Sequence, residues 1–288
     1  MTLFAAPLFT TDWSLTGALV SVAACAVAVV ALAKLADTET AEPEGRRPGG
    51  WRAAVALLLW PTSVFLVAGY DESLFLALAI PAWLAARRGR WPLAAALAAG
   101  ASCVRITGLF LALALIVEFF GSGTPVRRAG WLALPFAPLL LRSGWQRLNG
   151  GDWLTWGQAQ EAGWGRWFVW PWESLASIWR SALAEERSAL LFQMELAGAV
   201  FAVGLVLLLL FLRRWSELVY VGLQAGVLIC SASYLAIPRA VLLWWPVFVL
   251  VARAGARGRW WVLVVYALLT TPLMLLNALT YLESVRAG

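Results

Sequence analysis

The sequence predicts an all-α, polytopic integral membrane protein with about ten (8 to 10) transmembrane or re-entrant helices. Of its 288 residues, 62% are apolar and only 13% are charged, and the mean hydropathy is +0.77. A soluble domain usually has roughly 45–50% apolar and about 25% charged residues. The apolar residues form long runs that basic residues interrupt. We therefore expect residues 1–288 to form a single transmembrane domain.

Ten apolar stretches define the expected helices in chain order. They are residues 13–34, 52–69, 74–86, 92–104, 107–120, 129–141, 189–212, 216–236, 240–252 and 260–282. Several contain only 13 or 14 residues, fewer than the roughly 20 that an untilted span needs. We expect these shorter stretches to extend beyond the pattern, to tilt or to be re-entrant.

The basic residues predict the orientation of the chain. On this map, 14 of the 22 basic residues lie in loops on one side, which the positive-inside rule makes cytoplasmic. Both termini, the segment YDES (70–73) and the segment IPR (237–239) are then extracytoplasmic. So is the long loop at 142–188, which holds eight of the 19 tryptophans. Since tryptophan prefers the headgroup level, this loop is expected to form short amphipathic elements on the membrane, or a surface that stacks on carbohydrate.

Composition also excludes several kinds of chemistry. The chain has no histidine, so a His general base and His-ligated metal are excluded. No cofactor and no divalent metal are predicted. The net charge of +6 does not indicate a nucleic-acid partner, because the basic residues punctuate apolar segments.

Two adjacent carboxylates, Asp71 and Glu72, follow Tyr70 at the outer end of a predicted helix pair. Successive residues on a helix point about 100° apart, so only one of the two carboxylates can face inward. Glu72 is the better buried candidate. Asp71 alternatively caps the helix that begins near Leu74.

Arg105 and Arg239 are the candidate phosphate-binding cations. Arg105 is an isolated charge between apolar stretches, and such a residue is by default functional or paired. It either binds a lipid phosphate or forms a structural ion pair with Glu72 or Glu195. Arg239 either pairs with a phosphate or lies at the headgroups.

A third group of polar side chains lies among the tryptophans of the long loop. Asp152, Gln158 and Gln160 could bind sugar hydroxyls beside aromatic rings, or could be ordinary surface polar groups of an interfacial helix.

Four segments in this order resemble the PIG-V-like mannosyltransferases of the GT-C glycosyltransferase superfamily. They are WPTSVFLVAGYDESLFLAL, CVRITGL, GDWLTWGQAQEAGWGRWFVWPWESL and IPRAVLLWWPVFVL. The similarity runs over residues 11–282. The family usually has Ser-Glu-Ser after the tyrosine, so Glu72 and Ser73 match while Asp71 departs.

The resemblance implies a membrane mannosyltransferase that moves a sugar from a polyprenyl-phosphate donor to a lipid-linked or glycan acceptor on the extracytoplasmic side. Asp71 and Glu72 are the candidate catalytic residues. The substrate-binding candidates are Tyr70, Arg105, Asp152, Gln158, Gln160 and Arg239.

One family feature has no counterpart here. Family members begin with a further helix and a first loop whose Trp-Asp pair supplies the acid usually assigned as catalytic, and nothing in this sequence matches that loop. We therefore expect a family member that lacks this helix and loop, and little sugar transfer by the chain as given. The alternatives are a lipid or small-molecule transporter or flippase, and a non-catalytic membrane protein.

Overall fold

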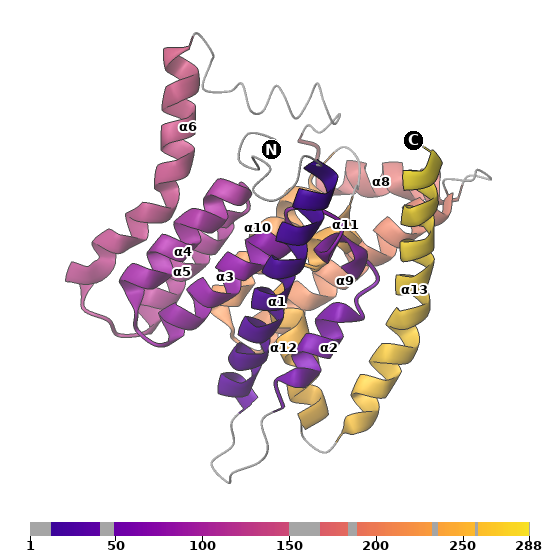
Figure 1. Ribbon diagram of the computed structural model, residues 1–288, viewed down its shortest axis with the longest axis horizontal. Coiled ribbons are helices and arrows are strands. Elements are labelled where there is room, and N and C mark those ends of the chain that lie inside the picture. The colour runs from indigo at the N-terminus through magenta and orange to yellow at the C-terminus, as the bar shows by residue number, and fades with distance from the viewer. Residues whose placement is uncertain are drawn as a thin grey trace. The chain divides into compact units, whose positions relative to one another are not determined.

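The computed structural model describes residues 13–40, 49–149, 168–183, 189–231, 236–256 and 259–287. Within these ranges every regular element is a helix (Figure 1). The one β contact among them is an isolated antiparallel bridge between Phe168 and Ser231. The predicted all-α class is confirmed for the part of the chain that is described.

Three helices are long and apolar enough to cross a membrane. They are α1 (Trp13–Thr40), α9 (Ala189–Phe211) and α13 (Trp260–Ala287). The shorter apolar helices are α4 (Trp91–Val104), α5 (Gly108–Gly121), α10 (Trp215–Ile229) and α12 (Trp245–Ala256). At about 1.5 Å per residue, a helix of 14 residues is about 21 Å long, which is shorter than the roughly 30 Å hydrocarbon layer. The described helices thus fit a membrane protein without supporting ten spans.

The predicted stretch at 52–69 is not one helix. It divides into α2 (Trp51–Leu58) and a 3-10 turn, η1 (Ser63–Leu66). Pro61 lies in the break between them. Proline has no backbone N–H and disfavours helical geometry in the residue before it, so the helix ends before Pro61.

Two other boundaries differ from the prediction. The stretch at 129–141 divides into η2 (Val126–Phe136) and α6 (Ala137–Leu148). The predicted loop therefore does not begin at residue 142, because the helix continues to Leu148. Arg142 and Arg147 are exposed on α6, so their charges do not end the helix.

The stretch at 240–252 is also interrupted. It contains the end of α11 (Ile237–Val241) and most of α12. Pro246 is the second residue of α12, where the missing N–H costs nothing.

The chain divides into two compact units, which we describe separately. Unit 1 contains Met1–Leu97 and Leu242–Gly288, and unit 2 contains Ala98–Val241. The prediction of one transmembrane domain for residues 1–288 stays a prediction.

In unit 1, α1 packs on α3 (Glu72–Arg87), and α12 packs on α2 (Figure 1). The rings of Trp83 and Trp245 lie 5.5 Å apart in its core, and both side chains are buried. The Tyr266 hydroxyl of α13 donates a hydrogen bond of 2.6 Å to the carbonyl of Ala56, which connects the last helix to α2.

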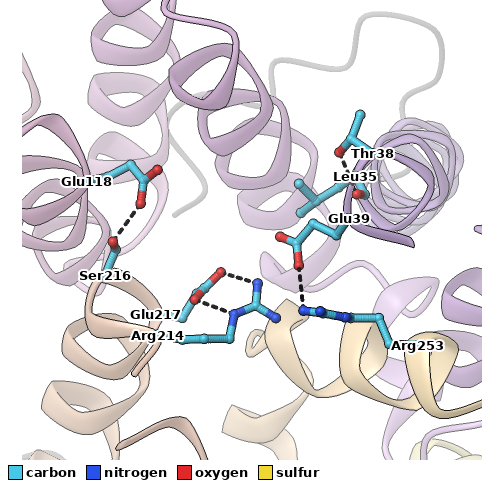
Figure 2. A network of polar contacts seen from close by, with 8 residues as sticks. All are labelled: Leu35, Thr38, Glu39, Glu118, Arg214, Ser216, Glu217 and Arg253. Carbon is cyan, nitrogen blue, oxygen red and sulfur yellow. Dashed lines mark hydrogen bonds and ion pairs between the residues drawn. The ribbon is translucent and has the colours of Figure 1, made fainter. Parts of the chain in front are cut away.

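In unit 2, α10 packs on both α5 and α9, and α8 (Pro171–Ala182) packs on α9. Charged groups lie at the start of α10 (Figure 2). The Arg214 guanidinium donates to both carboxylate oxygens of Glu217, at 2.7 and 2.5 Å. The Ser216 hydroxyl donates to Glu118 of α5 at 2.6 Å, which fixes the end of α5 against the start of α10.

Figure 2 also shows an ion pair within unit 1. Glu39, near the end of α1, lies 3.8 Å from the guanidinium of Arg253 on α12. Next to it, the Thr38 hydroxyl donates to the Leu35 carbonyl at 2.7 Å.

Candidate functional site

The predicted carboxylates lie at the start of α3, in a turn that α1 holds in place. Gly69 has a φ of +79°, a conformation that a residue without Cβ adopts readily. Its backbone lies close to Gly17 of α1. The Ser21 hydroxyl, also on α1, donates a 2.9 Å hydrogen bond to the carbonyl of Tyr70. Packing against α1 therefore fixes the backbone that precedes Asp71 and Glu72.

Glu72 and Asp71 differ in burial, as predicted. Glu72 is the first residue of α3 and is 0% exposed, as is Ser73, whereas Asp71 is half-buried. Asp71 occupies the N-cap position, but its side chain makes no capping hydrogen bond. The helix begins at Glu72 rather than near Leu74, so the Glu72 carboxylate lies in the first turn, where the helix dipole stabilises negative charge.

Arg105 lies in the short connection between α4 and α5, beside a buried polar pair on α10. Its charge acts on the hydroxyl of Tyr220, and the Gln224 side-chain amide donates a 3.2 Å hydrogen bond to the backbone carbonyl of Tyr220. Tyr220 is 0% and Gln224 is 3% exposed. Sequence analysis missed these two residues, although two polar side chains four residues apart in an apolar stretch are a visible signal.

The connection that holds Arg105 depends on a close approach of two backbones. A Cβ added to Gly108 would lie 2.5 Å from the Cα and N atoms of Ser102 on α4. Such contacts involve backbone atoms, so they can be relieved only by moving α5 away from α4.

Gly108→Ala is therefore expected to lower the free energy of unfolding by about 1–3 kcal/mol, the usual cost of overpacking. The measurement is the midpoint of thermal unfolding in detergent, followed by far-UV circular dichroism. Gly204→Ala on α9 is the matched control, because a Cβ there meets no atom within 4 Å. Equal midpoints for the two variants would contradict the close approach.

Arg239 lies half-buried on α11, in a segment that Glu195 of α9 anchors. The Glu195 carboxylate accepts hydrogen bonds from the backbone N–H groups of Ala236 and Ile237, at 2.7 and 2.8 Å. Ala236 has a φ of +66°, which is uncommon for a residue with a side chain. The two hydrogen bonds hold this strained backbone and so set the position of Arg239.

The remaining predicted substrate-binding residues, Asp152, Gln158 and Gln160, lie outside the described residues. The described part of the tryptophan-rich segment includes α8, whose buried face carries Ser174 and Ile178. The Ser174 hydroxyl donates to the Ser231 carbonyl at 2.5 Å, which holds α8 against the end of α10.

The other face of α8 and the residues before it expose aromatic rings. Trp170 and Trp172 stack with ring centroids 5.1 Å apart, and Phe168 packs edge-on against Trp170. These three side chains are 54–67% exposed. A short helix thus forms in this segment, and its place on a membrane surface stays a prediction.

The structure brings Tyr70, Asp71 and Glu72 together in unit 1. Arg105 and Arg239 belong to unit 2. The predicted ion pair between Glu72 and Arg105 stays a prediction. Among the described residues, no group of three or more His, Cys, Asp or Glu side chains could hold a metal ion.

No family model matches this chain, and neither the curated proteins nor the solved structures contain a match.

Proposed function

We propose that the protein is a multi-pass cell-membrane glycosyltransferase of the GT-C type, similar to the PIG-V-like mannosyltransferases. It moves a sugar from a polyprenyl-phosphate donor to a lipid-linked or glycan acceptor. The reaction takes place on the extracytoplasmic side, where both termini and the tryptophan-rich loop at 142–188 also lie.

The observation that supports this proposal most directly is the carboxylate pair at the start of α3. Glu72 is fully buried, and Asp71 beside it is half-buried. Burying a charged carboxylate costs free energy, so a buried carboxylate is a candidate functional residue. With no histidine in the sequence, a carboxylate is also the natural base for a hydroxyl group.

The reaction needs one base and one cation. The acceptor hydroxyl attacks the anomeric carbon, its proton passes to Glu72 or Asp71, and the polyprenyl phosphate leaves with the bonding electrons. Positive charge near the phosphate stabilises the departing anion, and Arg105 and Arg239 are the two cations that the sequence offers for this role. Arginine suits it because its planar guanidinium donates two parallel hydrogen bonds to a phosphate.

Donor binding tests the proposal. The full chain is reconstituted in nanodiscs, and a polyprenyl-phosphate-mannose is titrated against it by microscale thermophoresis. Arg105→Gln and Arg239→Gln are each expected to weaken binding by about tenfold or more, since a hydrogen bond to a charged group contributes about 1.5–3 kcal/mol.

Arg128→Gln is the control, because Arg128 is exposed on η2 and is expected on the cytoplasmic side. It should leave donor binding unchanged. A wild-type chain that binds no lipid-linked sugar would remove the glycosyltransferase proposal and favour transport or a non-catalytic role.

A further inference from the structure

Helix α8 carries a second apolar face, which the fold leaves exposed. One face of the helix packs on α9 and includes the buried Ile178. Apolar side chains that are 46–69% exposed recur at intervals of three or four residues, and they are Trp172, Leu175, Trp179 and Leu183. This spacing places them on one side of the helix, and we call these four residues the tryptophan face.

The buried face of α8 fixes the position of the helix along α9. Ile178 belongs to a buried cluster with Ala199, and Phe192 packs against this cluster. The Gln193 side-chain amide of α9 donates a 3.0 Å hydrogen bond to the carbonyl of Ala182, at the end of α8. The α9 residues in these contacts all belong to its first half, so α8 lies beside the N-terminal half of α9.

One edge of a membrane lies at this level if α9 crosses it. α9 is long and apolar enough to do so, and at about 1.5 Å per residue its 23 residues are about 35 Å long. The hydrocarbon layer is roughly 30 Å thick, so both ends of such a helix reach the headgroups. Gln193 is only about 6 Å from the start of α9. The end of α8 that it contacts therefore lies near the boundary between headgroups and acyl chains.

The residue types on α8 are those expected at this boundary. Tryptophan concentrates at the headgroup level because its ring is apolar and its N–H is polar, and leucine suits the acyl chains just below. A third side of α8 carries polar residues that are all exposed, namely Glu173, Ser177 and Arg180. An apolar face with aromatic residues and a polar face with a basic residue are typical of helices that lie at a membrane surface.

The charges of α8 also complement a phospholipid surface. Arg180 borders the tryptophan face, three residues before Leu183, and its Nε donates a 3.1 Å hydrogen bond to the Ala176 carbonyl. An exposed guanidinium in this position can bind a lipid phosphate while its stem covers apolar surface. The Glu173 carboxylate lies at the other end of α8, where it accepts a 3.3 Å hydrogen bond from the backbone N–H of Trp170.

A carbohydrate surface needs different neighbours for its aromatic rings. A sugar presents hydroxyl groups around its edge, and a binding site places carboxylates, amides or hydroxyls to meet them. Between and beside its two indole rings, the tryptophan face has Leu175 and Leu183, which form no hydrogen bonds through their side chains. The composition of the face therefore favours lipid over sugar.

We propose that α8 is an interfacial helix whose tryptophan face inserts at the boundary between the headgroups and acyl chains of a phospholipid leaflet. This contact ties the described part of the tryptophan-rich segment to the membrane. The inference is independent of sugar transfer, because it requires only that α9 crosses the membrane.

Nitroxide labels on single cysteines measure the depth of α8 in the membrane. The full chain, with its three native cysteines replaced by alanine, is reconstituted in nanodiscs of phosphatidylcholine and phosphatidylglycerol. Leu175→Cys and Leu183→Cys report on the tryptophan face, and Ser177→Cys on the polar side is the matched control. Power saturation compares collisions of each label with oxygen, which enters the acyl chains, and with a water-soluble nickel chelate.

The ratio of oxygen to nickel collisions is expected to be higher at both labels of the tryptophan face than at Ser177→Cys. Val200→Cys is the deep reference, because Val200 is exposed near the middle of α9. It should give the highest ratio, since an interfacial helix buries its apolar face only about 5–10 Å into the boundary.

Three results would overturn the inference. Equal ratios at Leu175→Cys and Ser177→Cys would place the tryptophan face in water, where a carbohydrate could reach it. Equal ratios at Leu175→Cys and Val200→Cys would place α8 within the hydrocarbon. A ratio at Val200→Cys as low as that at Ser177→Cys would mean that α9 does not cross the membrane. No sugar donor is used, so each result is separate from the outcome for the proposed function.

A second measurement applies if the chain without cysteines does not fold, as judged by far-UV circular dichroism. Benzoylphenylalanine then replaces Leu175 or Ser177 in the otherwise unaltered chain in the same nanodiscs. Irradiation is expected to add the mass of one phospholipid to the chain with the photoreactive group in place of Leu175, and not to the other. The absence of this adduct would contradict the inference.

Discussion

Glu217→Ala is expected to lower the free energy of unfolding by about 3–5 kcal/mol, the usual cost of removing one partner from a buried ion pair. Only 2% of the Glu217 side chain and 11% of the Arg214 side chain are exposed. The carboxylate accepts two hydrogen bonds from the guanidinium. Removing the Glu217 carboxylate leaves the Arg214 guanidinium buried without these two acceptor oxygens. Most of the lost stability is the desolvation penalty of the guanidinium charge.

Two further variants show whether the lost stability comes from the burial of the unpaired Arg214 charge. The double variant Arg214→Met and Glu217→Leu removes both charges and keeps much of the volume, so most of the lost stability should return. Glu39→Ala breaks the pair with Arg253 in unit 1, whose side chains are 13% and 36% exposed and whose closest atoms are 3.8 Å apart. A loss of only about 0–1 kcal/mol is expected there.

The measurement is reversible unfolding in mixed detergent micelles with increasing dodecyl sulfate, followed by tryptophan fluorescence. If Glu217→Ala and Glu39→Ala lost the same small amount of stability, Glu217 would be solvated and its burial would be contradicted.

The order of the helices could be predicted from the sequence because a long apolar run leaves the backbone few choices. Each apolar run must satisfy its own N–H and C=O groups, which a helix does within the run. The long run at 189–212 accordingly contains α9, and the run at 13–34 forms most of α1, which continues to Thr40. The burial of Glu72 was also predictable, since helical rotation allowed only one of two adjacent carboxylates to face inward.

The breaks and the long-range contacts could not be predicted in the same way. Apolar character continues through Pro61, so a hydropathy pattern does not show that α2 ends before it. The partners of Glu195 are backbone groups 41 and 42 residues further along the chain, and no local pattern indicates them. The edge-on contact of Tyr281, at the far end of the chain, with Phe65 of η1 was missed for the same reason.

If the wild-type chain transfers sugar robustly, against the little transfer expected of it, Glu72→Gln is expected to reduce that transfer by about 10²–10⁴-fold, the usual contribution of a general base, while leaving the donor affinity unchanged. The amide keeps the size and hydrogen-bonding capacity of the side chain but cannot accept the proton of the attacking hydroxyl. A loss of turnover without loss of binding is therefore specific to proton transfer.

Asp71→Asn is the variant to compare, because Asp71 is the other candidate base and is only half-buried. The measurement is transfer of labelled mannose from polyprenyl-phosphate-mannose in nanodiscs, with donor affinity determined on the same preparation. Robust transfer by the wild-type chain would show that the base lies within these 288 residues. A large loss in Asp71→Asn with full activity in Glu72→Gln would move the base to Asp71. Donor binding without transfer would match the little transfer expected of a chain that has no counterpart of the family's first-loop acid, and it would contradict the assignment of the base to Glu72 or Asp71.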